Sequence, residues 1–226
     1  MGYTDTPIGG GVIRRKIFGT DSIEDAVLVD DNCNYGSYNY IVIGYYNQWG
    51  KRRYLARITN SLPVGSILGF RFKMYRSVRG ESVDPGTLNV FALSDANTWV
   101  EGNSSGIAEV GAVTYIYAKY NTQLWAGSSF ASTSGLDYHA DASPPTLDYS
   151  SFTTGSPYWV TLDLKSEWVT NWRDNIWINN GIIIRSTIET NTTNIFFGQA
   201  TEQTSNQCYF EIDYIPDSNF RVMMLR

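Results

Sequence analysis

Polar and apolar residues alternate along much of the chain, and this period of two is the pattern of a strand with one buried and one wet face. The alternation is clearest at residues 51–59, 69–76 and 207–215. Short segments rich in Val, Ile, Tyr and Phe predict further strands at residues 26–30, 40–45, 88–93, 113–117, 158–162, 181–185 and 194–199. About ten short strands joined by polar turns predict an all-β chain, folded as a single jelly-roll β-sandwich.

One segment breaks the period of two. Leu164, Trp168 and Trp172 recur every four residues, a spacing that places them on one face of a helix. We therefore expect one short helix over residues 165–172, capped by Asp163 and closing one end of the sandwich.

Two further segments lie outside the regular pattern. Residues 126–154 are rich in Ser, Thr, Gly and Pro without a sustained period, and they predict a long surface excursion. Residues 1–22 form a Gly-rich leader with one strand-like piece at residues 11–18.

The composition excludes several function classes. The 226 residues carry 17 Lys and Arg against 22 Asp and Glu, a net charge of −5, whereas proteins that follow nucleic-acid phosphates need a basic surface. No apolar run approaches the roughly 18 residues of a membrane span. A single histidine, His139, excludes a metal cluster built from histidines. We expect no nucleic-acid partner and no membrane span.

The two cysteines, Cys33 and Cys208, are too few for a zinc site or a disulfide framework. Cys208 alternates with Phe210 and Ile212, which predicts that its thiol faces the core as a small apolar group. We expect no disulfide.

A series of motifs runs along the chain in a characteristic order. They are Asp31-Asn32-Cys33-Asn34-Tyr35-Gly36, the strand at residues 51–58, Leu62-Pro63-Val64-Gly65-Ser66-Ile67, Trp99-Val100-Glu101-Gly102-Asn103, Thr161-Leu162-Asp163-Leu164, Glu167-Trp168-Val169 and Asn180-Gly181-Ile182-Ile183-Ile184-Arg185. Their order and spacing resemble the DNRLRE family, also called carbohydrate-binding module family 96. The resemblance divides the chain into a leader at residues 1–22, a module at residues 23–215 and a tail at residues 216–226.

This resemblance implies a non-catalytic jelly roll, which in the family is usually appended to secreted enzymes or surface proteins. Acidic polysaccharides such as alginate are one known ligand class of the family. The chain departs from the family pattern at Ile58, where Phe is usual, and at Tyr115, where many members have Trp. Because the resemblance brings no ligand-binding motif, the binding residues have to be sought from the chemistry of sugar recognition.

Exposed aromatic rings are the first requirement, since a ring stacks on the apolar C–H face of a sugar. The candidate rings are Trp49 at a predicted hairpin tip, Trp125 at the start of the long excursion, and Tyr138 within it. The alternative is that these rings pack in the core or under loops.

Basic residues are the second requirement if the ligand carries carboxylates or sulfates. The alternation places Lys51, Arg53 and Arg57 on one face of a predicted strand. A second strand with Arg71, Lys73 and Arg76 would extend this into a local basic face. The alternative is an ordinary solvated strand face.

Residues 95–103 are the candidate for a cofactor. Asp95, Asn97, Glu101 and Asn103 provide four oxygen donors around a turn, and calcium prefers such donors. The spacing is not that of an EF-hand, so a structural turn is the alternative and no resident cofactor is expected.

Catalysis has little support in the sequence. Cys33 or Cys208 would have to meet His139 to form an activated nucleophile, and no local motif indicates this. We expect a protein that is not an enzyme.

The sequence thus predicts a non-catalytic polysaccharide-binding module, located outside the cell or on a virion surface. The alternative is a structural virion protein, such as a capsid decoration, fibre or tail component, with other virion or surface chains as partners. A start at Met without a secretory signal favours the alternative. So does the strand-like piece of the leader, which could pair with a neighbouring chain, or be an extra edge strand of the same sandwich.

Overall fold

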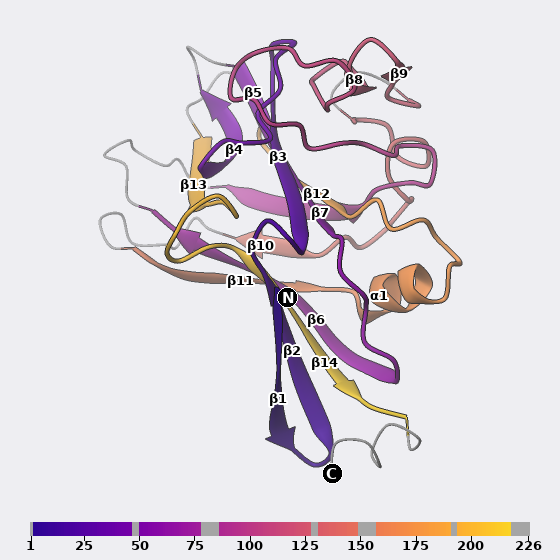
Figure 1. Ribbon diagram of the computed structural model, residues 1–226. Helices are drawn as coiled ribbons and strands as arrows, with labels where there is room; N and C mark the ends of the chain where they lie inside the picture. Colours follow the sequence, from indigo (N-terminus) through magenta and orange to yellow (C-terminus); the bar gives the residue numbers. More distant parts are fainter. Residues whose placement is uncertain are drawn as a thin grey trace.

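The computed structural model describes residues 2–46, 50–77, 86–127, 131–148, 157–190 and 194–217. Within these ranges the chain is almost entirely β (Figure 1). The strands are β1 (Tyr3–Gly9), β2 (Val12–Phe18), β3 (Ile23–Val29), β4 (Tyr40–Tyr46), β5 (Gly50–Ile58), β6 (Ser66–Arg76), β7 (Thr87–Ala92), β8 (Tyr117–Lys119), β9 (Gln123–Leu124), β10 (Thr146–Asp148), β11 (Tyr158–Leu164), β12 (Ile182–Ser186), β13 (Asn194–Gln199) and β14 (Tyr209–Ile215), and the helix is α1 (Ser166–Arg173). Among the described residues, no helix is long and apolar enough to cross a membrane.

Twelve strands belong to one antiparallel network in the order β1-β2-β14-β6-β13-β4-β5-β12-β7-β10, with β11 paired to β6 and β3 paired to β5. The network forms two layers. The first contains β1, β2, β14, β6 and β11, and the second contains β3, β5, β12, β7 and β10, while β13 and β4 connect them. The prediction of an all-β sandwich with one short helix is confirmed.

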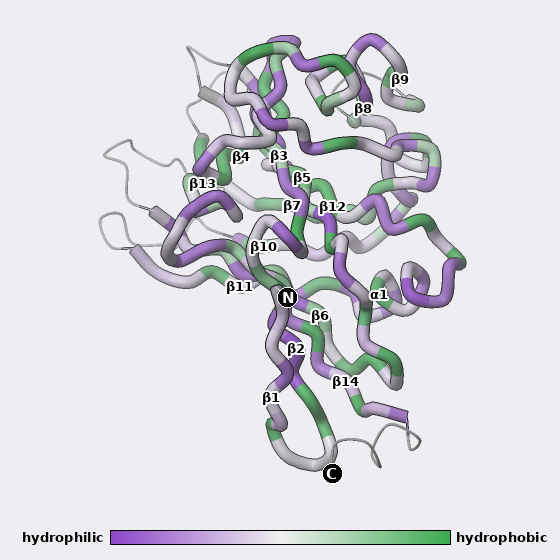
Figure 2. Tube along the Cα trace, in the orientation of Figure 1, coloured by the Kyte–Doolittle hydropathy of each residue, from purple (hydrophilic) through white to green (hydrophobic). Residues whose placement is uncertain are grey.

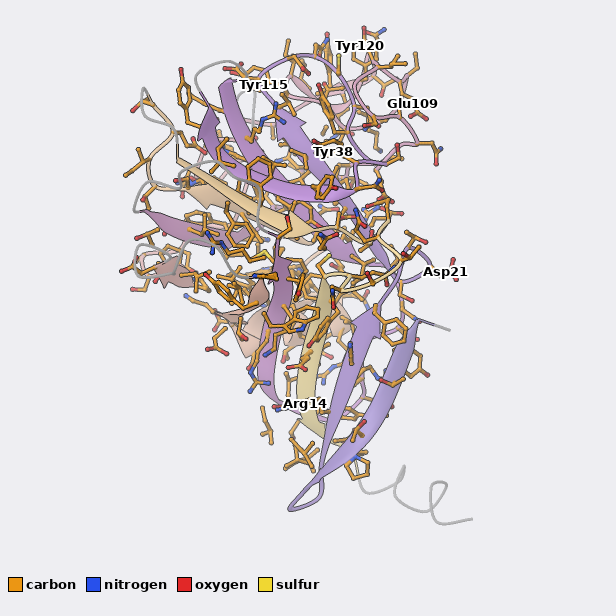
Figure 3. The ribbon with its side chains drawn as sticks, turned by 90° about the vertical axis from the view of Figure 1, so that its left-hand side faces the viewer. Arg14, Asp21, Tyr38, Glu109, Tyr115 and Tyr120 are labelled. Atoms are coloured by element: carbon orange, nitrogen blue, oxygen red, sulfur yellow. The ribbon has the colours of Figure 1, made fainter. Side chains whose placement is uncertain are left out.

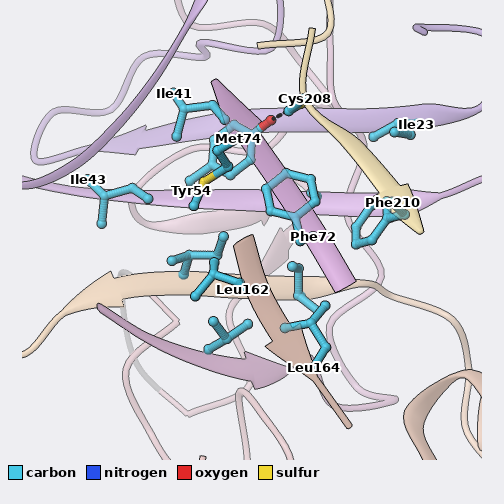
Figure 4. Packing of buried hydrophobic residues seen from close by; sticks show 14 of the residues in the cluster. Ile23, Ile41, Ile43, Tyr54, Phe72, Met74, Leu162, Leu164, Cys208 and Phe210 are labelled. Carbon is cyan, nitrogen blue, oxygen red and sulfur yellow. Dashed lines mark hydrogen bonds between the residues drawn. The ribbon is translucent and has the colours of Figure 1, made fainter. Parts of the chain in front are cut away.

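The core between the layers follows from the alternation. Phe72 on β6 and Phe210 on β14 have ring centroids 4.7 Å apart, and Tyr54 from the second layer stacks on Phe72 at 6.1 Å (Figure 4). All three are at most 1% exposed. Figure 2 shows the resulting mixture of hydrophobic and hydrophilic positions along the strands.

A second cluster covers the opposite side of the second layer. Leu55 and Ile183 point away from the main core and pack with Trp99, Trp125 and Tyr138, which come from the long connection between β7 and β10. The Trp99 indole nitrogen donates to the Asn180 carbonyl at 2.8 Å. The second layer is therefore buried on both faces, whereas the first layer keeps an open outer side.

The leader is part of the same sheet. The predicted strand at residues 11–18 is confirmed as β2, which pairs with β14. β1, which the alternation did not indicate, forms a hairpin with β2. The predicted strand at residues 113–117 is wrong except for Tyr117, the first residue of β8.

The helix prediction is confirmed, but its cap is not. Trp168 and Trp172 are buried against the core. Asp163 lies within β11, and the N-cap position is Lys165, which makes no side-chain capping bond. Leu164 ends β11 instead of starting the helix.

Both cysteines are free thiols, which confirms the expectation of no disulfide. Cys208 is fully buried, and its sulfur lies 3.4 Å from the Tyr54 hydroxyl, a contact drawn in Figure 4. The predicted inward direction of Cys208 is confirmed.

Truncation of Phe72 tests the core. We expect Phe72→Ala to lower the free energy of unfolding by about 3–5 kcal/mol, because it leaves a cavity between the two layers. The measurement is the midpoint of urea unfolding. Leu124→Ala is the control, since Leu124 is 60% exposed on β9, and its midpoint should hardly change. Equal midpoints for the two variants would contradict this account of the core.

Candidate functional site

The open side of the first layer is the candidate functional site. Because Phe70, Phe72 and Met74 of β6 face the core, the alternate residues of this strand point outward. The strand registers extend this surface, which we call the outer face, across β11, β6, β14 and β2. It consists of Trp159, Thr161 and Asp163 on β11, Arg71, Lys73 and Tyr75 on β6, Tyr209, Glu211 and Asp213 on β14, and Arg14, Lys16 and Phe18 on β2. Arg14 is labelled on this part of the sheet in Figure 3.

Three aromatic rings from three adjacent strands meet on the outer face. Trp159 lies with its ring centroid 5.2 Å from that of Tyr75 and 5.0 Å from that of Tyr209. The Lys16 ammonium lies over the Tyr209 ring, 3.9 Å from its centroid. Trp159 is 41% exposed, so a large apolar ring is presented to solvent beside charged groups.

The charged groups of the outer face are paired with one another. Arg14 donates to Asp213 at 2.7 and 2.9 Å, and Arg71 donates to the same carboxylate at 2.8 Å. These hydrogen bonds, with Arg14 first, hold the pKa of Asp213 below its ordinary value. Lys73 donates to the Thr161 hydroxyl at 2.7 Å and lies 3.9 Å from Glu211.

The aromatic residues expected to bind sugar lie elsewhere. Trp49 lies outside the described residues. Trp125 and Tyr138 are each 4% exposed, and the Trp125 indole donates to the Thr114 carbonyl at 3.2 Å. Tyr138 packs on Phe91 with centroids 4.4 Å apart. The expectation that these two rings are exposed is wrong, because the excursion folds back onto the second layer and buries them.

The expected basic face of β5 is also largely covered. Lys51, Arg53 and Arg57 share one side of the strand, but Leu55 between them belongs to the second cluster. Arg53 is 4% exposed and donates to Glu189 at 2.8 and 2.6 Å. Arg57 donates to Glu24 and lies over the Trp99 ring. Lys51 remains half-buried at the start of β5.

Only part of the second basic strand faces outward. Arg71 and Lys73 belong to the outer face. Arg76 lies an even number of positions from Phe72 and Met74, so it is on their side of β6. It is 7% exposed and lies near the Tyr158 hydroxyl. Grouping Arg76 with the other two cations was wrong, because an odd difference in position reverses the side of a strand. The same parity argument would have found Trp159, which shares the polar side of β11 with Thr161 and Asp163.

A hollow of about 480 Å³ lies between the end of β3 and the start of β5. Tyr35, Tyr38, Asp31 and Arg52 line it, and Figure 3 labels Tyr38 in the upper half of the molecule, away from Arg14. The Tyr35 hydroxyl donates to Asp31 at 2.7 Å. Tyr35 meets Tyr38 edge to face at 82°.

A buried group of carboxylates joins three distant parts of the chain. Asp25 on β3, Glu101 from the connection between β7 and β8, and Glu202 after β13 each place an oxygen within 4.8 Å of the others. Tyr54 and Thr201 donate hydroxyl hydrogen bonds to Asp25, and the Asp25 amide donates to Glu101 at 3.1 Å. Burial, followed by the neighbouring carboxylate, raises the pKa of Glu101 to about 10 and that of Glu202 to about 8. Burial also raises the pKa of Asp25.

This carboxylate cluster is the one group among the described residues that could hold a cation. Only Glu101 of the expected calcium turn belongs to it. Asp95 instead accepts a hydrogen bond from the Ile178 amide at 2.8 Å, and the Asn97 side-chain oxygen accepts one from the Ala126 amide at 2.9 Å. The oxygen donors of residues 95–103 therefore point to different partners, and both Asp25 oxygens already accept hydroxyl hydrogen bonds.

The carboxylate cluster should make stability fall as pH rises. Unfolded Glu titrates near 4.5, whereas folded Glu101 keeps its proton to about pH 10. Between these values the folded state binds more protons than the unfolded state, so the free energy of unfolding decreases with pH. We expect Glu101→Gln, which keeps the acceptor oxygen and cannot ionise, to flatten this decrease in urea unfolding between pH 5 and pH 9.

Asp163→Asn is the matched control, because the Asp163 side chain is 84% exposed and its loss should leave the slope unchanged. Parallel slopes for wild type and Glu101→Gln would contradict the protonated cluster. Loss of the pH dependence on adding calcium chloride would show instead that the cluster binds a cation.

Comparison with known proteins does not assign the chain to a family. No family model matches it, and no curated protein matches it. The function therefore has to be argued from the site itself.

Proposed function

We propose that this protein is a non-catalytic polysaccharide-binding module that binds its ligand on the outer face. The observation that carries the proposal is the exposed Trp159 ring in contact with Tyr75 and Tyr209 on an open sheet. Both neighbours meet Trp159 edge to face, at 65° and 63°, so a sugar ring can stack on the Trp159 ring itself while its hydroxyls reach neighbouring charged side chains. The motifs that resemble the DNRLRE family support the same function.

The outer face has the extent that a chain ligand needs. It runs across four neighbouring strands from β11 to β2, and adjacent strands are about 4.8 Å apart. This width accommodates several consecutive sugars, which suits a polysaccharide better than a free monosaccharide. We place the module outside the cell or on a virion surface, where polysaccharides are encountered.

Replacing Trp159 tests the proposal. We expect Trp159→Ala to weaken polysaccharide binding about tenfold, since losing one stacking contact of about 1.4 kcal/mol changes the dissociation constant by that factor. Affinity electrophoresis measures this change in gels that contain hydroxyethylcellulose, laminarin, arabinoxylan, polygalacturonate or alginate.

The matched control is Tyr120→Ala. Tyr120 packs edge to face on Tyr117 at 5.5 Å and lies at the opposite end of the molecule from Arg14 in Figure 3. Its loss should leave binding unchanged. Equal retardation of wild type and Trp159→Ala by every polysaccharide that binds would remove the outer face as the site.

A role as a structural component of a virion is the second candidate, and the edge position of β1 favours it. In the described part of the sheet, β1 is the terminal strand and pairs only with β2. An edge strand offers its backbone groups to a strand of another chain.

Charged side chains on β1 should prevent such pairing. If β1 mediates assembly, wild type should form larger species at high concentration in sedimentation velocity, and the double variant Thr4→Lys with Thr6→Lys should remain monomeric. A monomeric wild type at all concentrations would argue against self-assembly through β1.

A further inference from the structure

The charges of the outer face indicate which polysaccharides it selects. Resting on the proposed function, we infer that the outer face binds neutral polysaccharides and discriminates against uronates. The geometry behind this inference is the mutual pairing of the cations and carboxylates that share the outer face with Trp159, Tyr75 and Tyr209.

A uronate would need an arginine or lysine that is available to its carboxylate. Arg14 and Arg71 instead both donate to Asp213, at 2.7 and 2.8 Å. Arg71 is also 3.3 Å from Asp163. A ligand carboxylate at these guanidinium groups would have to share them with carboxylates of the protein, which already make charge-assisted hydrogen bonds and would repel it.

Lys73 and Lys16 are occupied in a different way. Lys73 donates to Thr161 and faces Glu211, and Lys16 lies over the Tyr209 ring. The described residues of the outer face carry four cations and three carboxylates, namely Arg14, Lys16, Arg71 and Lys73 against Asp163, Glu211 and Asp213. A single excess positive charge gives little attraction for a ligand with one negative charge on every sugar.

The same groups suit the hydroxyls of a neutral sugar. The Asp163 side chain is 84% exposed and can accept hydrogen bonds from hydroxyl groups. Lys73 sits between Tyr209 and Thr161 in the strand register, where it can donate to a hydroxyl of a sugar stacked on the rings. A neutral sugar therefore uses these donors and acceptors without breaking the ion pairs.

The test compares neutral with uronate polysaccharides at two salt concentrations. Hydroxyethylcellulose, laminarin and arabinoxylan are the neutral probes, and polygalacturonate and alginate are the uronate probes, each measured by isothermal titration at 20 and 500 mM NaCl. We expect at least one neutral probe to bind, with less than a twofold change between the salt concentrations and about tenfold weakening by Trp159→Ala. Uronates should bind at least tenfold more weakly than that probe.

The double variant Asp163→Asn with Glu211→Gln tests the role of the paired charges. Removing two carboxylates should raise uronate affinity at least tenfold at 20 mM NaCl and make it fall with salt. The affinity for the neutral probe should fall by less than the uronate affinity rises, because both substitutions keep an acceptor oxygen. An unchanged uronate affinity in this variant would overturn the inference.

The remaining outcomes separate this inference from the proposed function. Tighter, salt-sensitive binding of uronates by wild type, weakened by Trp159→Ala, would overturn the inference and leave polysaccharide binding intact. Binding of a neutral probe that does not depend on Trp159 would overturn the outer face as the site. Failure of all five probes to bind would overturn both.

Discussion

Phe72 and Phe210 are cross-strand neighbours in the first layer, with ring centroids 4.7 Å apart, and they face the second layer, where Tyr54 stacks on Phe72. Their burial fixes the register of β6 and β14, because a slip of one residue would exchange the two sides of a strand. Lys73, which follows Phe72, and Glu211, which follows Phe210, must then face outward. The same strand register therefore determines both the core and the proposed binding surface. The side chains that stabilise the fold also determine which groups a ligand can contact.

The two layers differ in solvent exposure, because only the second layer is packed against other parts of the chain on both of its faces. The long connection after β7 brings Trp99, Trp125 and Tyr138 onto the outer side of the second layer. This connection buries polar groups, which then need hydrogen-bond partners. Arg53 donates to Glu189, and the Trp99 indole donates to the Asn180 carbonyl. The first layer has no such cover among the described residues, so its polar side remains available for a ligand.

Charge is handled in opposite ways on the surface and in the interior. On the outer face, Arg14, Arg71 and Lys73 lie close to carboxylates, which leaves stacking and hydrogen bonding to select a ligand. In the interior, Asp25, Glu101 and Glu202 have hydroxyl and amide partners instead of cations, and burial favours their protonated forms. The first arrangement bears on ligand choice and the second on how stability varies with pH.

Three features could be predicted from local residue patterns: the strands with strong alternation, the side on which their residues lie, and the helix marked by Trp168 and Trp172. These features are local, since period and parity are properties of neighbouring residues. Tertiary structure alone decided which polar-looking sides stay exposed. Trp125 and Tyr138 were predicted to bind sugar and are buried. Trp159, which lies in the predicted strand at residues 158–162, is open to solvent. Likewise, Asp25 and Glu101 are 76 residues apart and meet only because the long connection after β7 folds back onto the second layer. Alternation shows that two residues lie on opposite sides of a strand, but whether a distant segment covers one side depends on the packing of the whole chain.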